Sequence, residues 1–406
     1  MTPARAYITS RILYGMKFGL ETTRALAAEM GHPERAYPTL LVAGTNGKGS
    51  VVAYLDAALR ASGLRVGRYT SPHLVRINER IVVGGREIAD AALDRAILRV
   101  RAAAERLVRR RVLRTHPTYF EGLTLAAFEY FRAARVDVAV LEVGLGGRLD
   151  ATNVSEPLCS AIVSIGRDHE QYLGTTLASI AREKAGVLRS GRPAVIGALP
   201  AAARRAVEKV ARRVGARLVD ASRVRRSLPP GLLPGDHQRQ NARVALGVLE
   251  EARRAGLAVD LRRVPRAFAS VRWPGRLQWV EGARPPLLLD GAHNPDGARA
   301  LARFLRTRRP FVLVFGVMAD KAVAAMARVL FPPAHAVVLT RAPGSRAATP
   351  EAIARSAGLP ATRARLERSV PRALRLASRL TPPGGIVVVA GSLYLVGDVL
   401  RRRGRR

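Results

Sequence analysis

The chain has 406 residues, of which 48% are hydrophobic, and it is long enough for two domains with large cores. Its single cysteine, Cys159, excludes an intramolecular disulfide bond and fits a reducing compartment. No stretch approaches the ~20 consecutive apolar residues of a membrane span. We therefore expect a cytoplasmic protein without a membrane partner.

The formal net charge of +37 is typical of nucleic-acid-binding proteins. The arginines, however, are spread over the whole chain, and aromatic side chains, which stack on single strands, make up only 5% of it. A general use of arginine in place of lysine explains the charge more simply. We expect no specific nucleic-acid partner.

Only five of the 68 basic residues are lysines, and they are Lys17, Lys48, Lys184, Lys209 and Lys321. Where such a chain keeps lysine, a compact ammonium or a reactive amine is the expected reason. Three of the five lie in segments typical of phosphate chemistry, namely GTNGKGS, REKAGV and FGVMADK. The pattern indicates an enzyme that uses a nucleotide, and chance retention of five lysines is the alternative.

The first part of the chain alternates strand and helix patterns. Residues 39–43 predict a short buried strand that leads through GTNGKGS into a helical pattern. Continuous apolar runs at 136–146, 158–166 and 192–198 predict further strands that are covered on both faces. This order predicts a doubly wound α/β domain with a phosphate loop, to which we assign residues 1–280.

A second α/β block follows a join near residues 271–282, where Pro and Gly interrupt the helical pattern. We predict a smaller, Rossmann-like C-terminal domain over residues 281–406. Its strand patterns alternate with arginine-rich helices and lie at residues 286–290, 310–316, 335–340 and 384–392.

The loop GTNGKGS lies between a predicted strand and a predicted helix, as a phosphate-binding loop does. Gly44, Gly47 and Gly49 let the backbone approach phosphate oxygens, and the helix N-terminus adds positive potential. Lys48 can reach the β- and γ-phosphates of a nucleotide. Because Gly49 stands where the common motif has a hydroxyl for Mg²⁺, that hydroxyl must come from Ser50 or from elsewhere.

Candidate metal ligands follow two of the predicted strands. Glu142 lies near the end of one apolar run, and His169 follows Asp168 just after another. Since parallel strands end at one edge of a sheet, Glu142 and His169 are plausible partners around a metal, with an ordinary loop histidine as the alternative. Lys184 lies in a helical pattern, where the default role is a surface ion pair.

Together these motifs resemble the folylpolyglutamate synthase/dihydrofolate synthase family of the Mur-ligase superfamily, which consists of ATP-dependent amide-forming ligases. The resemblance extends over nearly the whole chain and is specific in order and spacing. It implies an ATP-binding domain, a smaller C-terminal domain and catalysis in the cleft between them. The motifs are GTNGKGS (44–50), TSPHL (70–74), NER (78–80), TYFE (118–121), EVGLGGRLDATN (142–153), DHEQYLG (168–174), REKAGV (182–187), WPGR (273–276), LDGAHNP (289–295) and GSLYLVGDV (391–399).

The resemblance implies roles in nucleotide and metal binding. Mg²⁺, in two sites, would be bound by Ser50, Ser71, Glu142 and His169. Lys184 would carry a carbamate formed with CO₂, which needs a primary amine and so explains a retained lysine. The ATP contacts would be Gly44, Thr45, Asn46, Gly47, Lys48, Gly49, Ser50, Asn241, Arg276 and Asp290. The catalytic residues would be Lys48, Lys184, Arg276 and His293.

The resemblance also implies a pterin-side pocket. Phe120 offers it a stacking face, and a core phenylalanine is the equal alternative. Lys321 matches the family, whereas Ala322 replaces an acidic residue that often follows it. The pocket residues would be Thr118, Tyr119, Phe120, Glu121, Leu149, Asp150 and Ala151, with the segment KFGLE (17–21) as an addition.

The implied activity is ATP-dependent addition of L-glutamate to dihydropteroate, to (tetrahydro)folate, or to both, through an acyl phosphate. The products would be dihydrofolate or folylpolyglutamates, ADP and phosphate, and we expect a monomer. The alternatives are another Mur-type ligase, against which the TYFE segment argues, and an arginine-rich nucleic-acid-binding NTPase. ADP release that depends on pterin and glutamate would separate the ligase from the NTPase.

Overall fold

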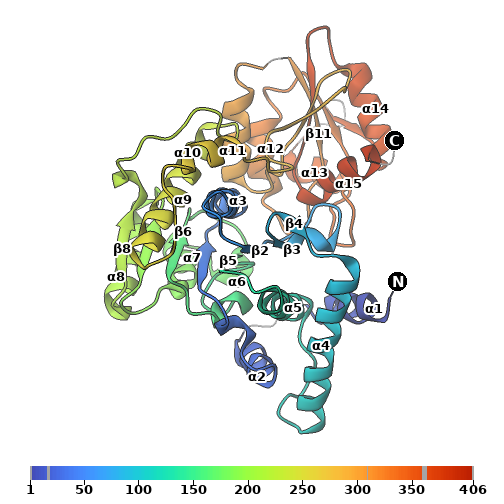
Figure 1. Ribbon diagram of the computed structural model, residues 1–406. Coiled ribbons are helices and arrows are strands. Elements are labelled where there is room, and N and C mark those ends of the chain that lie inside the picture. Colours follow the sequence, from blue (N-terminus) through green and yellow to red (C-terminus); the bar gives the residue numbers. More distant parts are fainter. Residues whose placement is uncertain (1, 16–18, 309, 359–363, 405–406) are drawn as a thin grey trace.

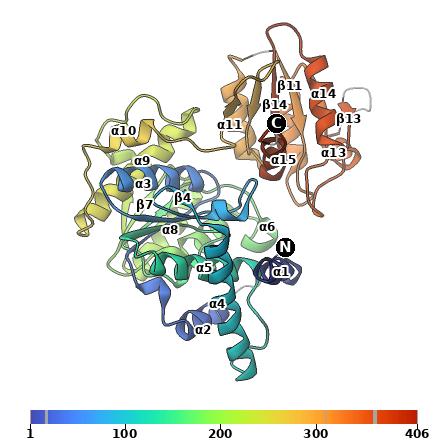
Figure 2. The ribbon, with the colours of Figure 1, turned by 45° about the vertical axis from the view of Figure 1, so that its right-hand side comes forward.

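The computed structural model contains two α/β domains, each with a central sheet between layers of helices (Figures 1 and 2). The described residues are 2–15, 19–308, 310–358 and 364–404. Lys17 and Phe18 of the KFGLE segment lie outside them, and so does the predicted contribution of these two side chains to the pterin pocket.

The first domain is built on an eight-stranded sheet. Its strands are β1 (Thr39–Ala43), β2 (Val66–Tyr69), β3 (Ile81–Val83), β4 (Arg86–Glu87), β5 (Val138–Glu142), β6 (Cys159–Ile162), β7 (Pro193–Ile196) and β8 (Arg217–Asp220). They lie in the order β4-β3-β2-β5-β1-β6-β7-β8, and only β3 and β4 are antiparallel to their neighbours. Every residue of β1 and β5 is buried, because central parallel strands are covered on both faces.

Helices cover both faces of this sheet. One face packs against α3 (Lys48–Ala61), α9 (Asp236–Arg254) and α10 (Val264–Ala269). The other face packs against α1 (Pro3–Ser10), α2 (Glu21–Glu29), α4 (Asp90–Arg109), α5 (Tyr119–Ala133), α6 (Glu170–Leu173), α7 (Leu177–Lys184) and α8 (Ala201–Val214). Short 3₁₀ segments are η1 (Arg11–Tyr14), η2 (Pro33–Arg35), η3 (Ile77–Arg80), η4 (Ala151–Val154), η5 (Ala185–Val187) and η6 (Ala221–Arg223).

The second domain has a six-stranded sheet with the order β13-β12-β11-β14-β10-β9. Its strands are β9 (Gln278–Val280), β10 (Leu287–Leu289), β11 (Phe311–Phe315), β12 (Ala336–Leu339), β13 (Ala364–Leu366) and β14 (Ile386–Ala390). One face carries α11 (Pro295–Leu305), α12 (Val323–Leu330) and α13 (Pro350–Ala357), and the other carries α14 (Val370–Leu380) and α15 (Leu393–Arg403).

The predicted fold class, two α/β domains each with helices on both faces of its sheet, is confirmed. Antiparallel edge strands were not predicted, because short exposed strands such as β4 lack a continuous apolar run. Strand β9 pairs with β10, so the second sheet begins shortly before residue 281. None of the described helices is both long and apolar enough to span a membrane.

Candidate active site

The phosphate loop connects β1 to α3 at the carboxyl edge of the first sheet. Gly47 has a φ of 85°, which L side chains rarely adopt, and a Cβ there would overlap the side-chain oxygen of Asn241. A Cβ on Gly49 would lie 3.1 Å from the indole nitrogen of Trp273. Close packing and the positive φ therefore require glycine at position 47, and a Cβ at position 49 would make a tight contact with Trp273. The loop presents the free N–H groups of the α3 N-terminus, which favour anions.

Lys48 begins α3 and folds back onto the loop. Its ammonium donates hydrogen bonds to the carbonyl oxygens of Gly44 at 2.9 Å and Thr45 at 3.3 Å. Burial lowers the pKa of Lys48, and the negative charge of Glu142 opposes that shift. The loop thus holds a positive charge where the phosphates of a nucleotide would lie.

Lys184 is the last residue of α7 and is only 5% exposed, which rules out the surface ion-pair alternative. Its amine donates a 3.0 Å hydrogen bond to the carbonyl of Gly44, the same oxygen that Lys48 binds. Burial, together with the charge of Lys48, lowers the pKa of Lys184 to about 7. A large fraction of this amine is therefore neutral, and nucleophilic, near neutral pH.

Glu142 ends β5 and is buried, and its Oε2 accepts a 3.1 Å hydrogen bond from the backbone N–H of Ser71. Burial raises the pKa of Glu142, and the charge of Lys48 opposes this effect. Ser50 is buried in the first turn of α3. Among the described residues, no three His, Cys, Asp or Glu side chains lie close enough to hold a metal by themselves. Carboxylate and hydroxyl oxygens nevertheless fit Mg²⁺, which is bound by one or two carboxylates together with substrate phosphates and water.

Residues of the second domain contact Asp168, which follows β6 of the first domain. The carboxylate of Asp168 lies 2.6 Å from Lys321 Nζ and 3.5 Å from His293 Nε2, and it accepts a 3.1 Å hydrogen bond from Asn294. Burial raises the pKa of Asp168, but the hydrogen bond from His293 and the charge of Lys321 outweigh it and hold the pKa below its ordinary value. Asn294 also donates a 2.9 Å hydrogen bond to Asn46 of the phosphate loop.

His169 lies beside this contact. Burial lowers the pKa of His169 to about 4, against the opposing charge of Asp168. The imidazole is therefore neutral near neutral pH, which is the form that binds metals. Its Nε2 lies 3.4 Å from Lys321 Nζ, so a metal at this nitrogen requires Lys321 to move aside.

Three further predicted nucleotide contacts lie around the loop. Asn241 of α9 is buried beside Gly47 and donates a 2.9 Å hydrogen bond to Gln238. Asp290 follows β10 and accepts 2.9 Å hydrogen bonds from the N–H groups of residues 277 and 292. Burial raises the pKa of Asp290, and the neighbouring charge of Arg276 opposes that shift.

A cleft of about 330 Å³ lies between the two domains. Gly49, Ser71 and Glu142 of the first domain line it together with Trp273 and Arg276, which lie at the join to the second domain. Hydroxyl and carboxylate oxygens and a guanidinium therefore face the same space.

Comparison with known proteins agrees with this geometry. Residues 275–393 match the model of the Mur ligase glutamate ligase domain. A dihydrofolate synthase/folylpolyglutamate synthase of Bacillus subtilis is 33% identical over 98% of each chain. The chain belongs to the folylpolyglutamate synthase/dihydrofolate synthase family. The predicted superfamily, ligase class and use of ATP to add glutamate are thereby confirmed.

Solved structures of the family have the same fold over the whole chain. Mycobacterium tuberculosis folylpolyglutamate synthase complexed with ADP has a TM-score of 0.91 at 32% identity, over 99% of each chain. Escherichia coli FolC in complex with DHPP and ADP has a TM-score of 0.88 at 32% identity, over 100% of this chain and 98% of that one. A bifunctional synthase with Mn, AMPPNP and L-glutamate bound has a TM-score of 0.88 at 32% identity, with the same coverage.

The predicted pterin-side residues of the ligase have structural roles of their own. Thr118 and Glu121 form a reciprocal cap at the start of α5, and Glu121 Oε2 accepts a 2.8 Å hydrogen bond from the Thr118 N–H. Asp150 caps η4 and accepts 2.9 Å hydrogen bonds from the N–H groups of residues 144 and 145. Burial raises the pKa of Asp150, and its hydrogen bonds with Thr152 oppose that rise.

The aromatic residues of this region are partly buried. The Phe120 ring lies 6.1 Å from that of Tyr69, and a Cβ on Gly144 would lie 2.5 Å from Phe120 Cζ. The guanidinium of Arg80 lies 5.4 Å from the ring centre of Tyr119. Leu149 is partly buried and Ala151 is buried on η4. Phe120 thus has core contacts and some exposed surface, so both of its sequence-based interpretations stay open.

The predicted site set omits three residues that the structure brings to it: Asp168, Asn294 and Lys321. A signal existed for each. Asp168 precedes His169, Asn294 lies in LDGAHNP, and Lys321 is one of the five retained lysines. Their pairing across the two domains depends on tertiary structure, and no local pattern indicates it.

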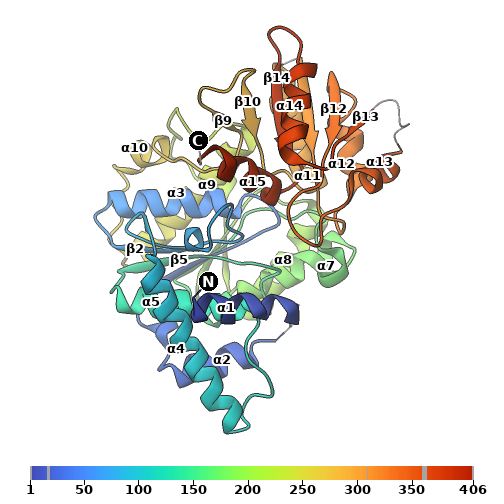
Figure 3. The ribbon, with the colours of Figure 1, turned by 90° about the vertical axis from the view of Figure 1, so that its right-hand side faces the viewer.

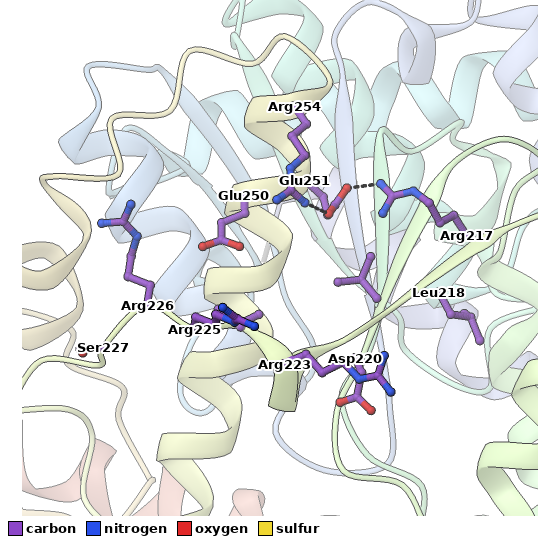
Figure 4. Close-up of a pocket in the computed structure, with 12 residues that line it drawn as sticks. Arg217, Leu218, Asp220, Arg223, Arg225, Arg226, Ser227, Glu250, Glu251 and Arg254 are labelled. Carbon is purple, nitrogen blue, oxygen red and sulfur yellow. Dashed lines mark hydrogen bonds and ion pairs between the residues drawn. The ribbon is translucent and has the colours of Figure 1, made fainter.

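A larger cavity, of about 860 Å³, lies on the first domain between β8 and the end of α9 (Figure 4). Two of its five arginines, Arg217 and Arg254, form ion pairs with the buried Glu251. The other three arginines are exposed on the segment that follows β8. The cavity is lined by more basic than acidic residues, as is typical of this chain as a whole. We assign this cavity no part in the ligase reaction.

Proposed function

We propose that this protein adds L-glutamate to dihydropteroate, to folate, or to both, at the edge of the first sheet that faces the second domain. The observation that supports this most strongly is the convergence of Lys48 and Lys184 on the Gly44 carbonyl. Neither lysine has an ion-pair partner among the described residues, so the ammonium of Lys48 is available to a phosphorylated substrate and the amine of Lys184 is available to react with CO₂. We also infer that the enzyme acts as a monomer in the cytoplasm.

The nucleotide is held by residues 44–50, with its triphosphate against the α3 N-terminus and Lys48. Asn241 is placed for an adenosine or phosphate contact because its side chain touches Gly47. Asp290 is placed for the ribose hydroxyls at the end of β10, and Arg276 for the phosphates. His293, which contacts Asp168, would approach the phosphates of the bound nucleotide.

Mg²⁺ is the metal that the oxygen donors of the site fit, with Ser50, Ser71 and Glu142 beside the phosphate loop and His169 as the ligand of a second site. The bound ion supplies charge neutralisation on the transferred phosphoryl group. His169 is available to it only after Lys321 has moved away from Nε2.

Lys184 carries a carbamate in the active enzyme. The neutral amine attacks the carbon of CO₂, a C–N bond forms as one C–O π bond opens, and one proton leaves to solvent, so a neutral amine becomes an anion. The lowered pKa of Lys184 supports this step, since only the neutral amine reacts. The resulting carboxylate would lie beside Gly44 of the phosphate loop and would add an anionic oxygen donor for the metal.

The reaction has two steps. A carboxylate oxygen of the pterin substrate attacks the γ-phosphorus of ATP, and the bond between that phosphorus and the β–γ bridging oxygen breaks. ADP departs, and the substrate carries the phosphoryl group as an acyl phosphate. The α-amine of L-glutamate then attacks the acyl carbon, the tetrahedral intermediate collapses, and phosphate leaves with the amine proton lost to solvent. Lys48 and Arg276 stabilise the developing negative charge, and closure of the cleft around the substrates would keep water from the acyl phosphate.

The pterin lies beside the Thr118–Glu121 and Leu149–Ala151 segments. Their caps hold the backbone rigidly, which preorganises the pocket wall. Phe120 supplies a stacking face from its exposed side.

The test is ADP release measured with dihydropteroate and with tetrahydrofolate, each with and without L-glutamate. Turnover that requires glutamate and either pterin supports the proposal, and the two arms show which pterin is used. ADP release that is independent of glutamate but stimulated by DNA or RNA would contradict it and favour the NTPase.

A further inference from the structure

One loop of the first domain lies against the last helix of the second domain. This connector loop, residues 70–76, follows β2 and contains Ser71, whose N–H binds Glu142. Leu74, in its middle, packs against the core cluster of the second domain that includes Val396 of α15. Figure 3 shows α15 at the junction of the two domains. The loop therefore connects the proposed metal site with the second domain.

The contact between the connector loop and α15 depends on glycine. A Cβ on Gly397 would overlap the carbonyl oxygen of Leu74 and lie 2.7 Å from its carbonyl carbon, so a larger residue requires the backbone to move. On the other side, a Cβ on Gly275 would lie 3.1 Å from Val396 Cγ1 and 3.5 Å from Leu74 Cδ1. Since alanine has the higher helix propensity, the close approach is the physical reason for glycine at position 397.

Hydrogen bonds from η3 make the connector loop rigid. The carboxylate of Glu79 accepts hydrogen bonds of 2.6–2.8 Å from three consecutive backbone N–H groups, those of residues 74–76. Arg80 donates from Nε to His73 Nδ1 at 2.8 Å, and its carbonyl accepts a 3.0 Å hydrogen bond from the Thr70 N–H. A loop held at both ends and in the middle passes on a displacement instead of absorbing it.

We propose that Gly397 is a positioning residue through which α15 sets the place of the connector loop, and thereby the contact of Ser71 with Glu142 at the metal site. The inference rests on the proposed metal role of Ser71 and Glu142. The interdomain cleft supports it, because Ser71, Leu74 and Glu142 line the same space as Leu393 and Leu400 of α15.

The test compares Gly397→Ala, within α15, with Gly404→Ala at the C-cap of the same helix. A Cβ on Gly404 meets only the Leu400 carbonyl oxygen, at an ordinary 3.7 Å, so this variant is the matched control. Mg²⁺ affinity is measured by calorimetry on the full chain with ADP, and amide hydrogen exchange is measured for the peptide that contains Ser71. For Gly397→Ala we expect about tenfold weaker Mg²⁺ binding, as when a group behind a metal ligand is lost, and faster exchange at Ser71. Gly404→Ala should leave both unchanged.

Leu74→Ala is the second variant, since it removes the side chain in the second-domain core without adding an atom. It should also weaken Mg²⁺ binding and speed amide exchange at Ser71. If Gly397→Ala does not fold, Leu74→Ala replaces it in the test. Glu142→Gln is the reference for the metal site itself. If Glu142→Gln weakens Mg²⁺ binding while Gly397→Ala and Leu74→Ala do not, the inference is wrong and the metal site stands. If Glu142→Gln has no effect, the metal assignment is wrong and the inference falls with it.

Discussion

The phosphate-loop region and the pterin-side region lie at the same edge of the first sheet, but their charged side chains have different hydrogen-bond partners. Lys48 and Lys184 donate only to backbone carbonyls of the loop, and among the described residues neither has an ion-pair partner. Glu121 and Asp150 are buried to the same extent as Lys184, yet each accepts hydrogen bonds from N–H groups of its own segment. The carboxylates of the pterin side therefore act as caps of the fold, whereas the two lysines of the phosphate-loop region do not.

This difference indicates which residues the fold itself needs. A buried amine without an ion-pair partner destabilises the folded state, so its presence points to chemistry. A carboxylate that caps a helix stabilises the fold, and any substrate contact comes in addition. Substitutions in the first region should therefore affect activity more than stability, and substitutions in the second should affect both.

The largest loss of activity is expected for Lys48→Ala. The ammonium contacts only loop carbonyls and faces the phosphate site, so its removal should lower turnover by at least about a hundredfold. Thermal unfolding should change little, because the change also removes a buried charge. Near-normal ADP production by a folded variant would show that the loop works without this cation.

Lys184→Arg should lower turnover by orders of magnitude, because a guanidinium cannot form the carbamate. Lys209→Arg is the matched control, since Lys209 is exposed on α8, and it should be silent. Lys184→Ala should lose activity to a similar extent, with partial recovery when short carboxylic acids occupy the vacated space. Full activity of Lys184→Arg would reject the carbamate.

Glu142→Gln and His169→Ala test whether the two ends of the metal region act together. Each change removes one ligand, so each should raise the Mg²⁺ concentration needed for half-maximal activity, by about tenfold or more. A wild-type Mg²⁺ titration curve for either variant would show that this residue does not bind the metal, and the assignment of the other residue would be unaffected.

Thr118→Ala tests the pterin side and should have a moderate effect. Loss of the α5 cap should lower the free energy of unfolding by about 1 kcal/mol. Thr349→Ala removes the cap of α13 in the second domain and should cost a similar amount. Only Thr118→Ala should also raise the KM for the pterin. Equal KM values in the two variants would show that Thr118 has only a structural role.

The last prediction concerns the dependence of stability on pH. The pKa of Lys184 is about 7 in the folded protein and near its ordinary 10.5 in the unfolded chain. Between these values the unfolded state binds more protons, so this residue makes folding more favourable as the pH rises from about 7 toward 10.5. Lys184→Met should flatten that part of the stability profile, measured by denaturant unfolding without CO₂. An unchanged slope would mean that the buried amine keeps an ordinary pKa.

Some of the fold was predictable because its signals are local. The strand at 39–43, the glycine loop and the following helix are indicated by adjacent residues, and the structure has β1 and α3 there. The edge strands β4 and β9 and the adjacent β3 were not predicted. A strand of two or three residues is too short to show a periodic pattern. Its pairing partner, which lies elsewhere in the chain, defines it.

The sequence by itself determined the family, the phosphate loop and the identity of the lysines worth attention, because residue type and order carry that information. Only the tertiary structure decided that Lys184 is buried against Gly44, that Asp168 is shared by Lys321, His293 and Asn294, and that Gly397 touches the loop of Ser71. Each of these contacts joins residues from separate elements or separate domains. Their burial, charge environment and close packing exist only when the chain has brought those elements together.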